Sequence, residues 1–362
     1  MKRVALIGTG LVGGSVGLAL RRSGVHVRAF DRDAERLGRA AEIGAIDEAA
    51  ESIAAAVEGA EVVLVAVPVG QIPDAVAAAL DAGAPAVTDV GSVKAPVVAA
   101  VAAARPDDAA RFIGGHPMAG SEQDGLEGAD PDLFVGATWV LTPTSYTDGN
   151  AFASVRSFVG ALGAEVLAVE PAHHDALVAL VSHVPQLAAT TLMDVAATHG
   201  EEHATLLRLA AGGFRDMTRI AAGHPGIWPD ICVANRDAIV AALDDYLSAL
   251  GRVRDLVQAA DRDALLDLLE RARNARRRLP VGMPTGEPLV ELRVPVVDRP
   301  GVIAEVATLA GAMGINIFDF ETAHSVEGGG GVLVLVVPER DAAAFEAALS
   351  ERGYHHASTP LP

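Results

Sequence analysis

The sequence contains a single cysteine, Cys232, among 362 residues. One cysteine cannot form an intrachain disulfide or a cysteine-based metal cluster, so we expect a protein of the reducing cytoplasm. Lysine is also scarce, with only Lys2 and Lys94 present, and the rest of the positive charge is arginine. The formal net charge of -19 argues against a nucleic-acid partner, because phosphate binding requires clustered basic residues.

Long apolar runs are absent too. No apolar stretch approaches the roughly 20 residues that span a bilayer, so we expect no membrane partner. Histidines and carboxylates lack metal-ligand spacing, since the adjacent His173 and His174 face different sides of a helix, and we expect no metal. With 51% hydrophobic and 21% charged residues, the chain is globular and long enough for two or three domains.

The first 31 residues follow the order strand, glycine-rich turn, helix, strand. The turn reads Gly8-x-Gly10-x-x-Gly13, and Asp31 ends the second strand. The first glycine forms the turn, the second lets a pyrophosphate approach the backbone, and the third packs the helix against the strand. The pattern predicts a dinucleotide site, with a simple tight turn as the alternative. Its contacts are expected from Gly8, Gly10, Leu11, Val12, Gly13, Asp31 and Arg32.

Asp31 also favours one cofactor over another. Its carboxylate can accept hydrogen bonds from the ribose hydroxyls of an adenosine and would repel a 2′-phosphate, so we expect NAD. Arg32 next to it is the residue that could tolerate the phosphate.

Further buried strands are predicted at 61–67, 84–89 and 111–115, separated by helices, as a parallel sheet requires. Ligands of such sheets bind beyond the carboxyl ends of the strands. Four residues stand at or just after the ends of these strands and therefore fall on the ligand side: Val67, Pro68, Ser92 and Lys94. The first three join the expected cofactor contacts. Ser92 could instead cap a helix that begins at Val93.

The third of these strands delivers His116 to the same edge, within the glycine- and proline-rich segment 114–122. A histidine titrates near neutrality and can take a proton from a hydroxyl while a hydride is removed elsewhere. The alternative is a loop histidine that caps a helix or fills a turn.

After a helix and strand at 151–162 and 164–169, the pattern becomes helical, with stretches at 171–199, 201–211 and 227–278. Long apolar helices usually pack on each other or on a second subunit, so we expect an all-helical dimerisation domain. Pro185 should kink its helix.

Two polar groups interrupt the apolar helical faces. Arg219 is a candidate clamp for a carboxylate, although it could equally form an ion pair with Asp216. His183 is a candidate substrate contact, although a lone histidine there could be a hydrogen-bonded core residue.

Residues 280–288 have linker composition, and the order predicted beyond them is βαββαβ, a ferredoxin-like arrangement. Gly301 at the first helix of this part allows the backbone to approach a small ligand. The predicted architecture is α/β: a Rossmann-type dinucleotide-binding domain (1–170), a helical domain (171–279), a linker (280–288) and a C-terminal domain (289–362).

Taken together, these motifs resemble the prephenate and arogenate dehydrogenase family of tyrosine biosynthesis. The resemblance covers nearly all of the chain. It rests on the glycine motif with Asp31, on Asp89-Val90-Gly91-Ser92-Val93-Lys94, on the 115–122 segment, on Ser182-His183-Val184-Pro185, and on the 213–221 segment. The C-terminal part resembles an ACT domain, a module that often binds an amino acid as a feedback signal.

The resemblance implies roles for individual residues. His116 hydrogen-bonds the ring hydroxyl and acts as base while hydride leaves for the nicotinamide of NAD, with Ser92 beside it. Arg219 binds a substrate carboxylate, and Trp228 reaches the pocket across a homodimer. Substrate contacts are further expected from His183, Gln186, Asp216 and Ser121. Gln186 stands where many prephenate dehydrogenases have a second histidine, which leaves prephenate or arogenate open, with prephenate preferred.

Two other functions are compatible with a dinucleotide site next to a helical domain. A dehydrogenase of β-hydroxy acids usually depends on a lysine in its helical domain, and no lysine occurs after Lys94. A non-catalytic sensor of NAD and an amino acid would not need His116, Ser92 and Arg219 together. Tyrosine is the expected effector of the ACT-like domain.

Overall fold

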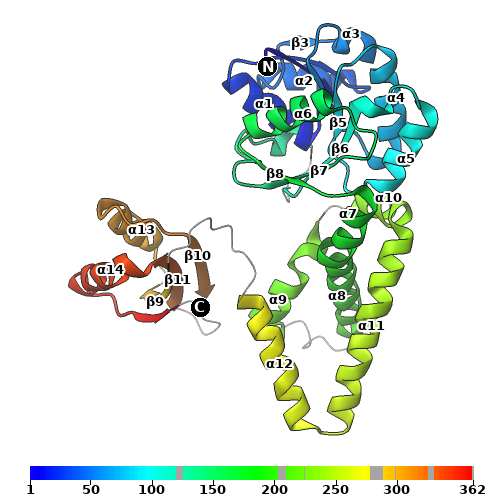
Figure 1. Cartoon of the computed structure of the whole chain (residues 1–362). Helices are drawn as coiled ribbons and strands as arrows, with labels where there is room; N and C mark the ends of the chain where they lie inside the picture. The colour runs from blue at the N-terminus through cyan, green and yellow to red at the C-terminus, as the bar shows by residue number, and fades with distance from the viewer. Residues whose placement is uncertain are drawn as a thin grey trace. The chain divides into compact units, whose positions relative to one another are not determined.

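The computed structural model of the chain describes residues 1–119, 125–202, 209–223, 225–277, 288–297, 299–324 and 330–360. The chain divides into two compact units, Met1–Leu250 and Gly251–Pro362, shown along the colour ramp of Figure 1.

The first unit is built on an eight-stranded sheet of order β3-β2-β1-β4-β5-β6-β7-β8. Neighbouring strands are parallel except β6 and β7, which are antiparallel. The strands are β1 (Arg3–Ile7), β2 (His26–Phe30), β3 (Glu48–Ala49), β4 (Val62–Val65), β5 (Val87–Asp89), β6 (Phe112–Pro117), β7 (Thr138–Thr142) and β8 (Glu165–Ala168). This is the Rossmann-like α/β arrangement that the sequence predicts, although β3 and β7 were not expected.

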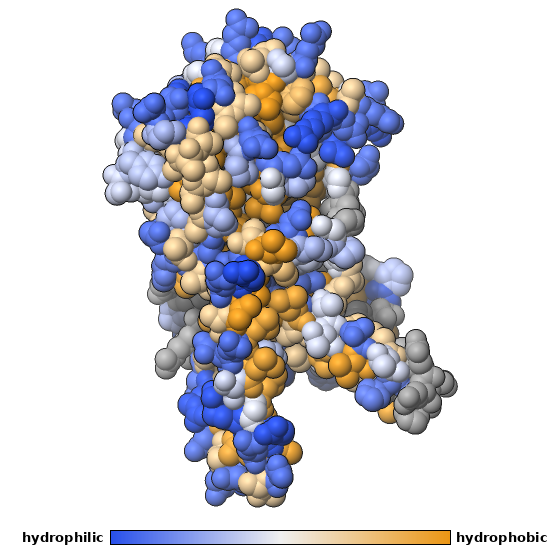
Figure 2. All heavy atoms as spheres, turned by 90° about the vertical axis from the view of Figure 1, so that its right-hand side faces the viewer, coloured by the Kyte–Doolittle hydropathy of each residue, from blue (hydrophilic) through white to orange (hydrophobic). Residues whose placement is uncertain are grey.

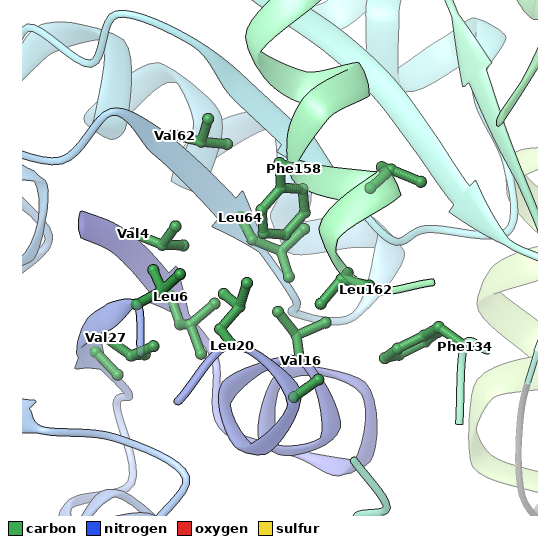
Figure 3. Close-up of a cluster of buried hydrophobic side chains, with 14 of the residues drawn as sticks. Val4, Leu6, Val16, Leu20, Val27, Val62, Leu64, Phe134, Phe158 and Leu162 are labelled. Carbon is green, nitrogen blue, oxygen red and sulfur yellow. The ribbon is translucent and has the colours of Figure 1, made fainter. Parts of the chain in front are cut away.

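Helices connect the strands: α1 (Leu11–Arg22), α2 (Ala34–Glu42), α3 (Ile53–Val57), α4 (Ile72–Asp81), α5 (Ala95–Ala104) and α6 (Gly149–Ala161). Two buried apolar clusters form where they pack on the sheet. In the first, Val16 and Leu20 of α1 and Phe158 of α6 meet Leu6 and Leu64 of the central strands (Figure 3). Burial on both sides explains why the central strands read as continuous apolar runs in the sequence.

The described residues between Pro171 and Gln258 are mostly helical. The elements are α7 (Pro171–Val178), the π-helix η4 (Ala179–His183), α8 (Val184–Glu202), α9 (Gly212–Thr218), the 3₁₀ turns η6 (Arg219–Ala222) and η7 (Pro225–Ile227), α10 (Trp228–Ala234) and α11 (Arg236–Gln258). The disturbance expected at Pro185 is a π-turn just before it. The helix expected at 227–278 is in fact broken near Asn235 and again after Gln258, and most of the one expected at 201–211 lies outside the described residues.

Several apolar side chains of this helical part are exposed, among them Val233, Val240 and Leu247, at 78%, 51% and 61%. Figure 2 shows apolar side chains, in orange, reaching the surface of the helical part as well as the sheet part. Val240 and Leu247 are seven residues apart on α11 and therefore lie on one side of that helix.

The expectation that no apolar stretch approaches the length of a membrane span is wrong. The helical run Pro171–His199 is long and apolar enough to cross a membrane by length and composition. Core helices of globular proteins pass the same test, and this run carries His174, Asp175, His183 and Gln186, all of them buried. Buried polar groups at these positions suit a helix that forms part of a polar site.

The second unit contains the end of α11, α12 (Arg262–Arg277) and a four-stranded antiparallel sheet of order β10-β11-β9-β12. Its elements are β9 (Leu289–Val297), α13 (Val302–Ala312), β10 (Asp319–His324), β11 (Gly330–Pro338), α14 (Glu339–Glu351) and β12 (Ala357–Pro360). The βαββαβ order predicted for this region is confirmed. The expected linker lies outside the described residues except for Pro288.

Candidate active site

A cleft of about 750 Å³ opens at the carboxyl ends of β1, β2 and β4. Its lining includes seven of the expected cofactor contacts: Gly8, Gly10, Leu11, Asp31, Arg32, Val67 and Pro68. Val12, Gly13 and Ser92 are not among its lining residues. Arg36, in the first turn of α2, lines the cleft as well, and no sequence pattern singled it out.

The three motif glycines have different steric surroundings. Gly8 has a φ of +97°, and a Cβ there would lie 2.3 Å from the carbonyl oxygen of Ala66. A Cβ on Gly13 would lie 2.1 Å from the carbonyl oxygen of Gly8, so α1 can pack this closely only without a side chain. A Cβ on Gly10 would meet nothing within 4 Å, which leaves open space for a ligand at the start of α1. These surroundings fit a pyrophosphate at a helix N-terminus.

Asp31 is held in place by Thr9, the residue between the first two glycines. The Thr9 N–H and hydroxyl donate to Asp31 Oδ2 over 2.8 and 2.9 Å, and the Asp33 N–H donates to Oδ1 over 2.9 Å. Arg36 Nη1 lies 3.8 Å from Oδ2. The carboxylate is thus oriented at the edge of the cleft before any ligand arrives.

His116 lies near the end of β6 and is 9% exposed. The glycines before it allow the strand to sit close to its neighbours: a Cβ on Gly114 would lie 2.5 Å from Thr142 Oγ1, and one on Gly115 would lie 2.5 Å from the carbonyl oxygen of Asp89. Burial lowers the pKa of His116 well below 6.5, and the positive charge of Lys94 lowers it further. The imidazole is therefore neutral at neutral pH and can accept a proton.

A buried ion pair lies behind this histidine. Lys94 and Asp89 are both fully buried and their side chains are in direct contact. Lys94 Nζ donates to the carbonyl oxygen of Gly115 over 2.8 Å, and the Gly115 N–H donates to Asp89 Oδ1 over 2.9 Å. The pair thereby fixes both polar groups of the residue that precedes His116. The expectation that Lys94 faces the ligand is wrong, because its ammonium group points into this pair.

Ser92 is half-buried on the loop between β5 and α5. It does not cap the helix, because α5 begins at Ala95 with Lys94 as its N-cap. The capping group comes from α7 instead: Asp175 accepts from the N–H groups of Lys94 and Ala95, each over 2.8 Å. Loop and helical region are joined at this point, and Ser92 is left on the ligand side of the sheet.

Two neighbouring residues of α7 reach the ring of His116. His116 Nδ1 and His174 Nε2 are 2.9 Å apart, and His174 Nδ1 is 2.8 Å from Asp175 Oδ1. His174 and Asp175 are 2% and 4% exposed. They form a buried chain of polar contacts that ends on the candidate base.

His183, at the end of the π-helix, is almost fully buried and faces the same region. The Asn235 amide donates to the carbonyl oxygen of Asp175 over 2.9 Å and lies 3.2 Å from His183 Nδ1. Because that carbonyl only accepts, the amide nitrogen must face His183, and Nδ1 must be the accepting nitrogen. Burial lowers the pKa of His183 to about 4, so its Nε2–H is available as a neutral donor.

The remaining expected substrate contacts are placed unevenly. Gln186 is buried one turn after His183, and Trp228 packs edge-on against His183 with ring centroids 6.1 Å apart, within the same chain. Arg219 and Asp216 are exposed on η6 and α9, and η6 packs against α8, the helix of Gln186. Ser121 lies outside the described residues.

Sequence reasoning missed several residues of this site: Thr9, Arg36, Asp89, His174, Asp175 and Asn235. His174 and Asp175 are polar residues in an otherwise apolar helical stretch, which is the signal that could have assigned them. Asn235 had no such signal, because its role depends on a contact with His183, 52 residues away. Among the described residues, no group of three His, Cys, Asp or Glu side chains is arranged to hold a metal ion.

Comparisons with known proteins match both the sheet part and the helical part of the chain. Residues 16–168 match the family described as "Prephenate dehydrogenase, nucleotide-binding domain", and residues 170–271 match "Prephenate dehydrogenase, dimerization domain". The chain is 33% identical over 338 residues to prephenate dehydrogenase of Bacillus subtilis (strain 168), which covers 91% of this chain and 90% of that one.

Solved structures give the same result. The crystal structure of prephenate dehydrogenase from A. aeolicus in complex with hydroxyphenyl propionate and NAD+ is 31% identical with a TM-score of 0.70, and covers 76% of this chain and 97% of that chain. The crystal structure of Synechocystis arogenate dehydrogenase is 31% identical with a TM-score of 0.66, covering 76% and 98%.

Proposed function

The chain belongs to the prephenate dehydrogenase family, and we propose that it converts prephenate to 4-hydroxyphenylpyruvate by oxidative decarboxylation with NAD. The observation that carries this proposal is the buried His116 at the end of β6, on the same sheet edge as the glycine-lined cleft. Burial holds the pKa of this histidine well below 6.5, which suits a proton acceptor. The product ring is aromatic, so the reaction is strongly downhill. The protein has to orient the substrate, take one proton and hold charge.

The cleft supplies the cofactor site. The turn of Gly8, Gly10 and Gly13 would hold the pyrophosphate and Asp31 the ribose hydroxyls, with further contacts from Leu11, Arg32, Val67 and Pro68, which line the cleft. Val12 and Ser92, which do not line it, are proposed as cofactor contacts from the sequence motifs alone. NAD, when bound, supplies the acceptor for the hydride. The negative charge of Asp31 supports NAD over NADP, because a 2′-phosphate would be repelled.

His116 would take the proton from the ring hydroxyl, with Ser92 beside it as a second hydrogen-bonding group. His183 would offer its Nε2–H to the substrate, since its Nδ1 accepts from Asn235. Arg219 would bind a carboxylate, because a guanidinium group pairs with carboxylate in two-pronged geometry. Asp216, Trp228 and Ser121 are proposed to complete the pocket.

Gln186 bears on the choice of substrate. It is buried beside His183, where its neutral amide can meet the side chain of prephenate (a keto acid) or arogenate (an amino acid). We favour prephenate. An arogenate dehydrogenase is the alternative, supported by the similarity to the Synechocystis structure.

The exposed apolar residues of α10 and α11 support assembly into a homodimer, because such a stripe on a long helix is usually buried against a second copy. The match of residues 170–271 to the dimerization domain of the family supports the same assignment. We propose a cytoplasmic location, as for a biosynthetic enzyme with a single cysteine and small-molecule ligands.

We assign the C-terminal sheet and its two helices to an ACT domain with tyrosine as effector, following the domain bounds proposed from the sequence. A cavity of about 1200 Å³ lies beside the start of α13, where Gly301 has a φ of +91°. Glu305 of this cavity accepts from Arg299 and from the Tyr354 hydroxyl. Small-molecule binding beside a glycine at a helix start is physically reasonable.

The test is the formation of reduced nicotinamide, followed by absorbance, with the purified chain and either prephenate or arogenate, each with NAD and with NADP. Faster NADH formation from prephenate is expected. Reaction with arogenate alone would change the substrate and the meaning of Gln186, and reaction with neither would contradict the proposal.

A further inference from the structure

His116 does not stand alone in its buried setting. Its Nδ1 contacts His174 Nε2 over 2.9 Å, and His174 Nδ1 contacts Asp175 Oδ1 over 2.8 Å. All three side chains are at least nine-tenths buried. Water therefore does not set which ring nitrogens carry protons, and the neighbouring groups must do so.

The order of donors and acceptors starts at Asp175. Its two oxygens accept from the N–H groups of Lys94 and Ala95 at the start of α5, an arrangement that suits a carboxylate. A carboxylate can only accept, so His174 must carry a proton on Nδ1. In neutral His174, Nε2 is then the accepting nitrogen, and the contact with His116 requires a proton on His116 Nδ1.

We propose that His174 and Asp175 are positioning residues that hold the proton of His116 on Nδ1 and so present the lone pair of its Nε2 to the substrate hydroxyl. This inference rests on the proposed function of His116 as the base. The opposite tautomer would carry a hydrogen on Nε2 and could not accept the hydroxyl proton.

One proton moves from the substrate to His116 and back during the reaction. The O–H bond of the substrate breaks as its proton moves to His116 Nε2, and the same proton returns to the phenolate oxygen once hydride and carbon dioxide have left the ring. No proton is consumed or released overall. While His116 is positively charged, its Nδ1–H still donates to His174, and the carboxylate of Asp175 lies beyond that ring.

Other charged or titratable groups face this chain from different elements. Lys94, before α5, and His183, in η4, both lower the pKa of His116, so they disfavour its positively charged form, in which both ring nitrogens carry a proton. Asp89 of β5 is paired with Lys94, so its charge is compensated. Among the residues that the structure describes, Asp175 is therefore the carboxylate placed to fix the orientation of the two imidazoles.

The direct test is ¹⁵N NMR of the histidine rings in the full chain at neutral pH. The His116 signals are identified by their loss in His116→Asn. We expect Nδ1 to be protonated and Nε2 to be unprotonated. A wild-type His116 that carries its proton on Nε2 would overturn the proposal, and this readout needs no variant of His174 to fold.

Kinetics supply the second readout. His174→Leu removes the acceptor and should lower kcat at least about 100-fold with KM for NAD nearly unchanged. His174→Gln should recover at least about tenfold of that loss, because its Oε1 can accept from His116 Nδ1. His173→Leu, an exposed neighbour on α7, is the matched control and should leave kcat unchanged.

If His174→Leu lowers kcat no more than His173→Leu, or if His174→Gln is as impaired as His174→Leu while folded, the positioning role is wrong. If the predicted tautomer is found but neither prephenate nor arogenate reacts, the proposed function fails and the tautomer assignment stands.

Discussion

Lys94 Nζ donates a 2.8 Å hydrogen bond to the carbonyl oxygen of Gly115, the residue directly before His116. The same ammonium group pairs with Asp89, and neither side chain reaches solvent. The position of the proposed base thus depends on an ion pair that the substrate never touches.

Lys94→Met should therefore destabilise the fold. It leaves the Asp89 carboxylate buried without its partner, which costs about 3–5 kcal/mol in the free energy of unfolding. Urea denaturation measures the loss. The double variant Lys94→Met/Asp89→Asn is the control and should recover much of it, because no uncompensated charge remains; equal stability of the two variants would contradict this account of the pair.

Gly115→Ala tests the close approach of β6 to its neighbours. The added Cβ would lie 2.5 Å from the carbonyl oxygen of Asp89 and 2.9 Å from Trp139 Nε1. We expect a loss of about 1–3 kcal/mol in unfolding free energy, with reduced turnover as His116 shifts. Gly38→Ala on the exposed face of α2, where a Cβ meets nothing within 4 Å, should instead stabilise by about 0.5–1 kcal/mol. A Gly115→Ala protein as stable and active as wild type would contradict this prediction, because it would show that β6 can shift to accommodate the added methyl group.

Stability should fall as the pH is lowered from about 6.5 to 4. The pKa of His183 is lowered from 6.5 to about 4 by burial, so in this range the unfolded chain binds a proton that the folded chain does not. The stabilisation that the folded chain gains by keeping His183 neutral is complete above pH 6.5 and is lost toward pH 4, and it amounts to about 3 kcal/mol in total. Burial of His116 acts in the same direction, because it lowers the pKa of that histidine as well. Urea titrations at several pH values give the slope. His183→Gln should flatten it, whereas His173→Gln should not; identical slopes would contradict the assignment.

Asp31→Ala should shift the cofactor preference. It removes the charge that would repel a 2′-phosphate and leaves Arg32 and Arg36 at the cleft. The ratio of kcat/KM with NADP to kcat/KM with NAD should rise at least about tenfold, which corresponds to about 1.4 kcal/mol. Thr9→Val keeps the carboxylate and loses one hydrogen bond to it, so its ratio should change less. An unchanged ratio in Asp31→Ala would place the discrimination elsewhere.

Much of the first unit could be predicted from local sequence. The central strands are buried on both sides and leave continuous apolar runs, and the glycine motif with Asp31 marks the first turn. β7 was missed because it pairs antiparallel with β6, outside the expected alternation of strand and helix. The break at Asn235 was missed because Asn is not a strong helix breaker, and its amide serves a tertiary contact with His183.

The candidate site was predictable only in part, for a similar reason. His116, His183 and Gln186 stand out as polar residues in motifs or on apolar helices. Lys94 could have faced solvent or ligand; only the fold shows that it pairs with Asp89. The cap of α5 comes from Asp175, 80 residues away, and no local pattern can show a cap of this kind.

The most direct test of the account compares wild type with His116→Asn in the rate of NADH formation from prephenate, together with the affinity of both proteins for NAD. We expect NADH formation by the wild type, a kcat lowered about 10²–10⁴-fold in His116→Asn, and an unchanged affinity for NAD. Normal turnover by His116→Asn would contradict the assignment of His116 as the base.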